Sequence, residues 1–246
     1  MRGLLKASLI FAAMSSLDAA APSRASSDGV PLPPVRPAEL GTAGRSEPGP
    51  EPSSRSSEAT AAETCPAQLR REGVVFTEAP RVASNGNACQ VREPVALVSV
   101  PDAGGRSIRF DGTPIIDCSL AKPLAVWTRE IAAPVLTQSL GSQVSRLRDV
   151  GGYECRNRNG DGSGKVSAHA EGLAIDLGAF EMSDGTIVSV VPGRLPRADA
   201  AIAALRQAAC GWFLTVLGPG TDPAHATHLH LDVQQHGSSD RYRICQ

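Results

Sequence analysis

The stretch SAHAEGLAID (residues 167–176) runs from polar residues into apolar ones, and we expect a strand over residues 173–180. A second stretch, HATHLHLD (residues 225–232), ends in alternating polar and apolar residues, which predicts a final strand over residues 228–233. Four of the five histidines of the chain lie in these two stretches. The two stretches therefore carry most of the groups that are capable of chemistry.

The spacing of the polar residues in these stretches favours a metal site. Side chains two residues apart in a strand share a face, so His228, His230 and Asp232 are expected to point the same way. A first-row divalent metal ion binds imidazole nitrogen and carboxylate oxygen at about 2 Å, and a catalytic zinc keeps one position for water. We expect His169, Asp176 and one or two groups of the second stretch to converge on such an ion.

Each motif alone also fits a structural role. Two histidines on one strand can belong to the core, Asp176 can cap a turn, and Ser167 can be a plain loop residue. Gly172 can be present only because the backbone needs a positive φ. The occurrence of both motifs in one chain favours the metal site over coincidence.

The segments before the first motif predict mixed secondary structure. Residues 91–100 have strand preference, and Pro94 confines that strand to a sheet edge or a bulge. Asp117 and Ser119 can cap a helix that has Pro123 in its first turn. Apolar residues then recur at helical spacing, and a kink is expected at Pro134.

Further strands and helices follow in an irregular order. Residues 144–155 indicate a strand, residues 156–165 a polar loop and residues 198–209 an alanine-rich helix. The short apolar run 213–217 ends at a Gly-Pro-Gly turn. This order is neither a regular βαβ series nor all-β, so we expect an α+β fold.

The N-terminal part of the chain differs in composition from the rest. Residues 1–21 have a basic start, a short apolar run and small residues, as in a cleaved export signal, although a buried helix is an alternative. Residues 22–64 are rich in proline and serine and contain no aromatic residue, which predicts a disordered linker. Its proline-rich run 31–37 could also dock in an aromatic groove. Residues 65–246 are long enough for one domain with its own core.

All the cysteines fall in the predicted domain. An even number of cysteines behind an export signal predicts three disulfides in an oxidising compartment. Fifteen pairings are possible, and we expect a bond between Cys65 and Cys89 because it closes a short local loop. The six residues are Cys65, Cys89, Cys118, Cys155, Cys210 and Cys245.

The formal net charge of −1 gives no indication of nucleic-acid binding or of a polybasic membrane contact. No stretch of the sequence is apolar over the length of about 20 residues that a membrane-spanning helix needs. Nucleic acid is therefore not an expected partner, and no transmembrane segment is expected.

The paired motifs SxHxxGxAxD (167–176) and HxH (228–230) resemble the LAS metallopeptidases, a group with lysostaphin-type, D-Ala-D-Ala peptidase and hedgehog-like domains. A longer resemblance, from Cys65 to Cys245, is to the bacterial extensin-like C-terminal domain family. It includes the segments GYECR (152–156), FLTVLGPG (213–220) and HLHLD (228–232). The HxxHxH spacing (225–230) is also similar to that of penicillin-insensitive murein endopeptidases. These resemblances imply a small antiparallel sheet flanked by helices.

The resemblance also implies roles for particular residues. His169, Asp176 and His230 become the ligands of a zinc ion, and His228 becomes the candidate general base. Relatives in the peptidase group often have a glutamate three residues before the last ligand, but Thr227 stands there. This departure favours the murein-endopeptidase variant and leaves the assignment of the base open.

Three further residues have weaker implied roles. His225 becomes a second polar group at the scissile bond, and Asp232 can orient a histidine from outside the ligand set. Arg156 corresponds to an arginine near the substrate of related enzymes, with a plain surface arginine as the alternative.

The implied activity is zinc-dependent hydrolysis of peptide cross-links in peptidoglycan, of the DD- or LD-endopeptidase or carboxypeptidase type. Its partners would be peptidoglycan stem peptides, and its location the periplasm or cell envelope. The alternatives are a non-catalytic zinc-containing module that binds the cell envelope, an amidase that cuts the sugar–stem linkage, and a purely structural zinc domain.

Overall fold

The computed structural model describes residues 63–246 except residues 80–88, 161, 163, 194 and 240. The expected export signal (1–21) and nearly all of the expected linker (22–64) lie outside the described residues. Glu63 and Thr64 are described: Thr64 is the N-cap residue of the first helix, and Glu63 forms an ion pair with Arg71. The described fold therefore begins just before Cys65.

Ten strands of the described chain form one mixed sheet, whose main path runs in the order β1-β2-β3-β5-β6-β9-β8-β10. Strand β4 pairs with β2, and β7 pairs with β6. Most neighbours are antiparallel, whereas β3–β5 and β8–β10 are parallel. The strands are β1 (Val75–Glu78), β2 (Pro94–Pro101), β3 (Ser107–Phe110), β4 (Ile115–Asp117), β5 (Val144–Gly151), β6 (Ala174–Met182), β7 (Ile187–Ser189), β8 (Thr215–Leu217), β9 (Leu229–Asp232) and β10 (Ile244–Cys245).

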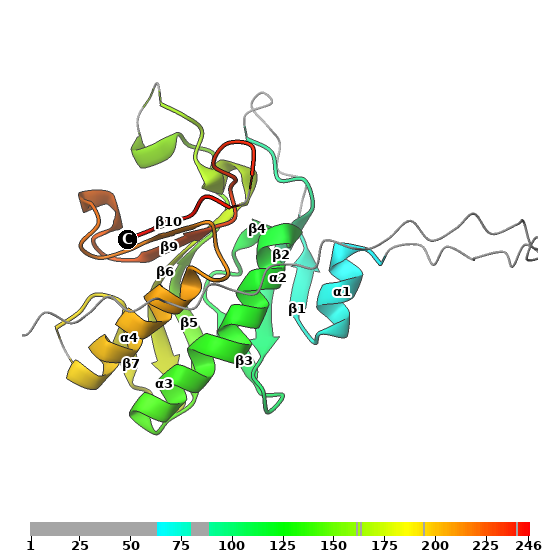
Figure 1. Cartoon of the computed structure of the whole chain (residues 1–246). Helices are drawn as coiled ribbons and strands as arrows, with labels where there is room; N and C mark the ends of the chain where they lie inside the picture. The colour runs from blue at the N-terminus through cyan, green and yellow to red at the C-terminus, as the bar shows by residue number, and fades with distance from the viewer. Residues whose placement is uncertain (1–62, 80–88, 161, 163, 194, 240) are drawn as a thin grey trace, which may run out of the picture. The chain divides into compact units, whose positions relative to one another are not determined.

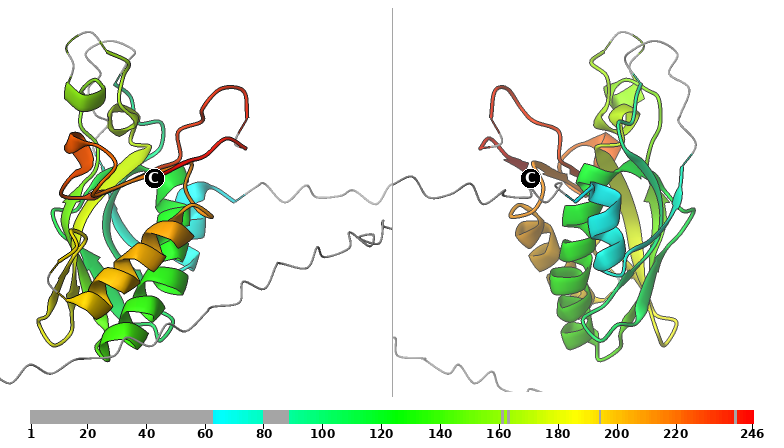
Figure 2. Two further views of the ribbon diagram at one scale, coloured as in Figure 1. Left: turned by 60° about the vertical axis from the view of Figure 1, so that its left-hand side comes forward. Right: turned by 90° about the vertical axis from the view of Figure 1, so that its right-hand side faces the viewer.

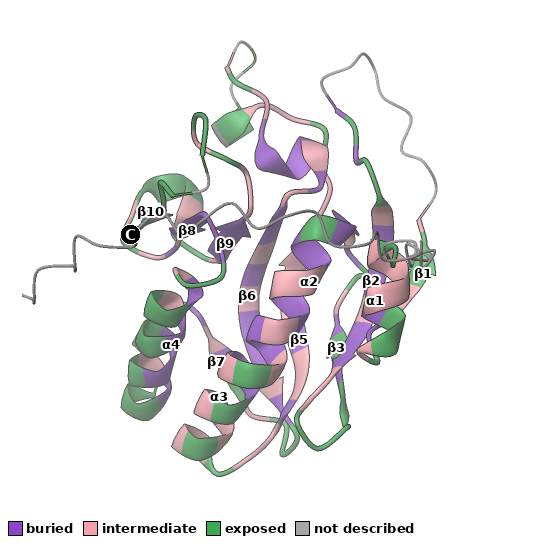
Figure 3. Cartoon of the chain, turned by 45° about the vertical axis from the view of Figure 1, so that its right-hand side comes forward, coloured by how far each residue is buried: buried purple, intermediate pink, exposed green. Residues whose placement is uncertain are grey.

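The helices pack on one face of this sheet, which Figure 2 shows from two sides. Their inward faces are buried and their outward faces exposed (Figure 3), as expected for amphipathic helices on a sheet. The helices are α1 (Cys65–Arg71), α2 (Cys118–Trp127), the π-helical turn η1 (Thr128–Ala132), α3 (Ala133–Leu140) and α4 (Pro196–Ala209), and the short 3-10 turns are η2 (Arg158–Gly160), η3 (Ala168–Glu171) and η4 (Pro223–His225).

The core lies between the helical layer and the sheet. Trp127 is fully buried at the end of α2 and packs at a tilt against Phe180 of β6 and edge-to-face against Phe213 before β8. Ile202 and Leu205 of α4 are buried in the same cluster, as their helical spacing predicts. The other face of β5 and β6 is left available for polar side chains.

The α+β class is confirmed (Figure 1), with a sheet that is larger than expected and partly parallel. Two details of the expected elements differ. Pro94 is the first residue of β2, which pairs on both of its sides, so the strand is not at an edge; the alternative, a bulge, agrees with the register shift of β2 against β1 between Leu97 and Ser99, away from Pro94 itself. Pro123 lies inside α2, because the Asp117 side chain caps the helix from the residue before Cys118. At the expected kink, Pro134 lies in the first turn of α3, and a π-helical turn directly precedes that helix.

Three disulfides are present, as expected, but Cys65 is not bonded to Cys89. Cys65 begins α1 and Cys118 begins α2, and these neighbouring helices bring the two Cα atoms within 6.1 Å. Cys89 instead bonds Cys155 beyond the end of β5. The disulfide pairing of Cys65 therefore follows from the packing of two helices and not from its short sequence separation from Cys89.

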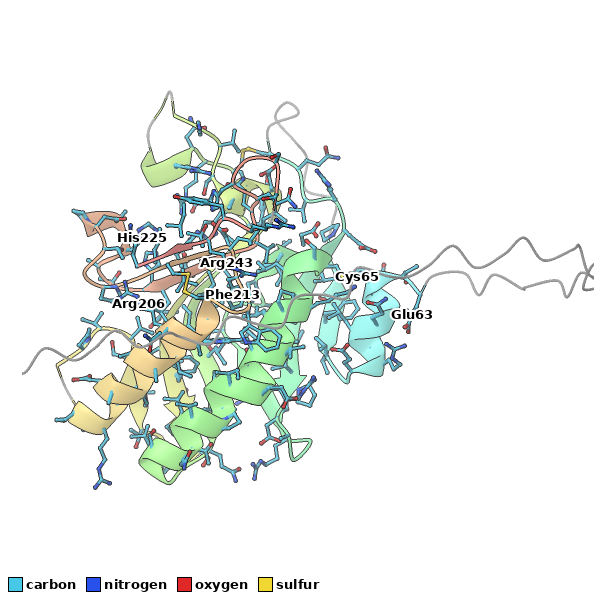
Figure 4. All side chains as sticks on the ribbon, in the orientation of Figure 1. Glu63, Cys65, Arg206, Phe213, His225 and Arg243 are labelled. Atoms are coloured by element: carbon cyan, nitrogen blue, oxygen red, sulfur yellow. A yellow bond between two sulfur atoms is a disulfide. The ribbon has the colours of Figure 1, made fainter. Side chains whose placement is uncertain are left out.

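The third disulfide joins Cys210 after α4 to Cys245 in β10. Arg243, labelled in Figure 4, strengthens this attachment because its guanidinium donates to the carbonyl oxygens of Cys210 and Phe213. The C-terminal strand is thus fixed beside β8. Within the described residues, no helix is both long and apolar enough to cross a membrane.

Candidate metal centre

His169 lies on the short 3-10 turn η3, whose ends are fixed by its neighbours. The Ser167 hydroxyl accepts the backbone N–H of His169 at 3.3 Å. Gly172 ends the turn with a φ of 68°, and its N–H donates to the carbonyl of His169. The predicted positive φ at Gly172 is therefore confirmed.

Gly172 also lies too close to other backbone to carry a side chain. A Cβ at this position would lie 2.8 Å from the backbone nitrogen of Asp117, which donates to the Gly172 carbonyl. Glycine thus allows the turn to rest against the junction of β4 and α2. This contact fixes the position from which His169 reaches the site.

The two predicted motifs meet across adjacent strands. Asp176 of β6 is directly opposite His230 of β9 in their antiparallel pairing. Directly opposite residues of an antiparallel pair project their side chains to the same face, close together. The strand pairing therefore places one candidate ligand of each motif side by side.

Three ligand atoms form a compact triangle. His169 Nε2 lies 3.2 Å from His230 Nδ1 and 3.3 Å from Asp176 Oδ1. His230 Nδ1 lies 3.0 Å from the same oxygen. The expectation that these three residues converge agrees with this geometry, and they form a group that could hold a metal ion.

The second nitrogen of each imidazole is occupied. His169 Nδ1 lies 2.7 Å from the carbonyl oxygen of Gly152, which can only accept, so this nitrogen carries the proton. His230 Nε2 lies 3.1 Å from the carboxylate of Asp232. With protons at these outer positions, both inner nitrogens would be available as ligands to a metal ion beside Asp176.

This donor set fits a small divalent cation. Two ligands of a tetrahedral ion with bonds of about 2.0–2.1 Å lie about 3.3 Å apart, and the three separations agree with this value. The two facing imidazole nitrogens beside a carboxylate need a positive charge between them, which a proton on His230 supplies here and a bound cation could supply in its place. Outer hydrogen bonds that fix the tautomer are also typical of metal-binding histidines.

The charges within the cluster are strongly coupled. Burial raises the pKa of the Asp176 carboxyl, but hydrogen bonds from His169 and His230 outweigh burial and bring that pKa well below its usual range. Burial lowers the pKa of His230, but the carboxylates of Asp176 and Asp232 outweigh burial and raise it to about 9. The site therefore attracts positive charge.

His228 and His225 lie beside this triangle. His228 Nε2 is 3.4 Å from Asp176 Oδ1, and burial lowers the pKa of His228 below its usual value. The ring centroid of His225 lies 5.4 Å from those of both His228 and His230. His225, labelled in Figure 4, is held by Asp222, whose carboxylate accepts from His225 Nδ1 at 2.9 Å.

The arginine expected near the site lies at its rim. Arg156 lines the same cleft, but its guanidinium is bound to the exposed carboxylate of Glu154 at 2.7 Å. Arg158, which the sequence did not single out, also lines the cleft and donates to the side-chain amide oxygen of Gln234 at 2.6 Å. Both arginines therefore lie on the wall of the cleft but outside the histidine cluster.

The cleft has a volume of about 380 Å³, and all five histidines line it. The fifth, His236, was missed from the sequence; its Nε2 lies 2.7 Å from the hydroxyl of buried Thr215. Asp222 was missed as well. The presence of every histidine of the chain in or just after the two motifs was the signal that could have included His236.

The described chain is thus an α+β domain with three disulfides, which indicate an oxidising compartment, and a histidine–carboxylate cluster in a cleft. The family model described as "Extensin-like protein C-terminus" matches residues 63–246. The chain therefore belongs to the extensin-like C-terminal family. Comparisons with curated proteins and with solved structures found no match.

Proposed function

We propose that this domain is a zinc-dependent hydrolase of peptide cross-links in peptidoglycan, related to the LAS-type peptidases and of the DD- or LD-endopeptidase or carboxypeptidase type. The observation that carries the proposal is the triangle of His169 Nε2, His230 Nδ1 and Asp176 Oδ1, with sides of 3.0–3.3 Å on the wall of a cleft. Two histidines and one carboxylate are a known ligand set of catalytic zinc.

The number of ligands favours a catalytic site over a structural one. Structural zinc sites are usually closed by four protein ligands, mostly cysteine and histidine. All six cysteines are used in disulfides, and the cleft side of the triangle has room for a substrate group. The set of three ligands would leave one position of a tetrahedral ion open to the cleft.

A zinc ion in such a site lowers the pKa of its bound water and polarises a carbonyl group. The protein must then provide a group that accepts the proton of the attacking water. His228 is suitable because its lowered pKa keeps its imidazole neutral near pH 7, and its Nε2 is directed to Asp176 beside the ligand triangle. The same nitrogen can return the proton to the leaving amine.

His225 would orient the substrate rather than exchange the proton. Asp222 accepts from Nδ1 of His225, so the other ring nitrogen is free to accept a hydrogen bond in the cleft. Its ring packs against His228 and His230, which fixes its position beside both. We assign it to binding of a backbone N–H near the scissile bond.

The proposed location is the periplasm or cell envelope, where the substrate polymer lies. Three disulfides in a domain of this size support an exported protein. The expected export signal in residues 1–21 agrees with this location.

Purified protein incubated with isolated sacculi tests the proposal. Mass spectrometry of the soluble products should find muropeptides with newly formed termini at the cross-link, and a chelator should abolish their release. A protein that binds zinc and sacculi but releases nothing would be the non-catalytic envelope-binding module instead. A new amine on the stem where it joined the sugar would indicate an amidase.

A further inference from the structure

Strand β5 contains a backbone anomaly close to the candidate metal centre. Asp149 has a φ of 53°, in the left-handed region that side chains other than those of glycine rarely adopt. On the opposite strand, Gly178 leaves the necessary room, since a Cβ there would lie 2.7 Å from that of Asp149. Residues that are held in this region of the backbone cluster at functional sites, and aspartate is among the side chains that tolerate it.

The anomaly interrupts the regular alternation of core-facing and outward-facing residues on both strands. Leu147 is opposite Phe180, and both face the core. The next opposite pair that faces the core is Val150 and Leu177, which is three residues further along each strand instead of two. The positive φ at Asp149 thus turns its side chain out of the core onto the exposed face. Glycine would adopt this backbone conformation without strain, so the shape of the strand does not explain why position 149 carries a carboxylate.

The side chain of Asp149 is free to meet a ligand. Within the described part of the chain, its carboxylate has no hydrogen bond and no ion pair. The neighbouring cation, Arg148, is bound to Glu181 at 3.0 Å and lies 3.7 Å from Asp111. The negative charge of Asp149 is therefore left uncompensated at the surface.

Asp149 lines a second cleft, of about 680 Å³, that adjoins the first. The two clefts share Asp176 and His228 as a common wall, so they meet at the candidate metal centre. The first cleft contains both cations and carboxylates, Arg156 and Arg158 as well as Asp222 and Asp232, whereas the second has no lysine or arginine among the described residues that line it. A cationic group of a substrate that extends into the second cleft would therefore meet Asp149 without competition from a neighbouring cation of the described wall.

We propose that Asp149 binds an ammonium group of the substrate in this second cleft and so determines specificity for peptides with a free amino group next to the scissile bond. The inference rests on the proposed peptidase function. A carboxylate that accepts hydrogen bonds from an ammonium group forms a charge-assisted contact, which is stronger than a contact between neutral groups. An acylated amine would lose this contact.

The test compares Asp149→Asn with the wild-type protein on a matched pair of substrates. These are a cross-linked muropeptide with its free amino groups and the same muropeptide after acetylation. Asparagine also tolerates the left-handed backbone, so the change removes the charge and keeps the strand. Asp184→Asn, on the β6–β7 turn outside both clefts, controls for a general loss of charge.

We expect Asp149→Asn to lower kcat/KM for the free-amino substrate about tenfold, mainly through KM. The kcat/KM for the acetylated substrate should be the same in Asp149→Asn as in the wild type, and so should the melting temperature and the zinc content. Asp184→Asn should behave as the wild type with both substrates. An unchanged preference for the free-amino substrate in Asp149→Asn overturns the inference while the peptidase function stands.

Binding of the two fluorescently labelled muropeptides to chelator-treated protein separates this inference from the proposed function. If the wild type hydrolyses neither substrate but binds the free-amino form more tightly, and Asp149→Asn does not, Asp149 is the ammonium site of a binding module. Equal binding of both forms by the wild type, without hydrolysis, contradicts both proposals.

Discussion

His169 Nε2 and His230 Nδ1 face each other at 3.2 Å, and each ring uses its other nitrogen for a hydrogen bond that leads away from the partner. One ring is fixed by the carbonyl of Gly152 and the other by the carboxylate of Asp232. The two histidines lie 61 residues apart in the chain, and they meet because the turn η3 leads directly into β6, which pairs with β9. The candidate ligand set depends on this relationship.

Removal of Asp232 should weaken the metal site without changing its ligands. The Asp232 carboxylate accepts from His230 Nε2 and fixes the tautomer that presents Nδ1 to the cluster. Loss of such an outer partner typically lowers metal affinity 10–100-fold. Asp232→Ala should therefore raise the Kd for zinc by that factor, as measured by competition with a chromophoric chelator.

Asp222→Ala is the matched control for this prediction. Asp222 makes the equivalent contact to His225, which we do not count among the ligands. The zinc affinity of Asp222→Ala should therefore equal that of the wild type. An equal loss of affinity in both variants would mean that His225 also binds the metal.

Gly172→Ala should destabilise the domain and the site together. The new methyl group would meet the backbone nitrogen of Asp117 at 2.8 Å, and alanine disfavours the φ of 68°. We expect a loss of about 2–5 kcal/mol in the free energy of unfolding. Because the same turn carries His169, zinc affinity should fall as well.

Gly141→Ala separates backbone strain from steric clash. Gly141 has a similar φ of 72°, but a methyl group there would meet nothing within 4 Å. The free energy of unfolding of Gly141→Ala should therefore fall by only about 1–2 kcal/mol, and its zinc affinity should not change. Thermal unfolding and zinc titration of the two variants measure both effects, and equal stability losses would argue against the close contact at Gly172.

The disulfides should differ in their effect on the metal site. Replacement of Cys89 and Cys155 by alanine opens a loop of 66 residues, and replacement of Cys210 and Cys245 opens one of 35, so each should cost about 4 kcal/mol in the chain-entropy model. Cys155 lies three residues from Gly152, whose carbonyl holds His169.

Only the loss of the Cys89–Cys155 bond should therefore reduce zinc affinity at a temperature where both variants are folded. Non-reducing peptide mapping of the wild type checks the pairing itself. A peptide that links Cys65 to Cys89 would refute it.

The local chemistry of the site was predictable from the sequence, whereas its long-range geometry was only partly so. The gathering of histidine and carboxylate in two motifs indicated His169, Asp176 and one or two groups of the second motif, and the resemblance to the LAS metallopeptidases implied His230 as the third ligand. The register that places Asp176 opposite His230 could not be derived, since it depends on which strands become neighbours.

The cysteine pairing shows the same limit. Cys65 meets Cys118 because two helices pack together, and no local property of the sequence indicates that contact. Asp149 is a second case: nothing in its neighbours in the sequence predicts a left-handed residue within a strand. Its conformation becomes intelligible only with Gly178 on the opposite strand.

The central claim is that His169, Asp176 and His230 hold a zinc ion while His228 acts on the attacking water. Zinc analysis of purified His230→Ala and His228→Ala, next to muropeptide release from sacculi, tests it most directly. His230→Ala should lose both zinc and activity. His228→Ala should keep about one zinc per molecule and lose 10²–10⁴-fold in rate, as expected for a general base. If His228→Ala loses its zinc as fully as His230→Ala, then His228 is a ligand and the assignment of the site is wrong.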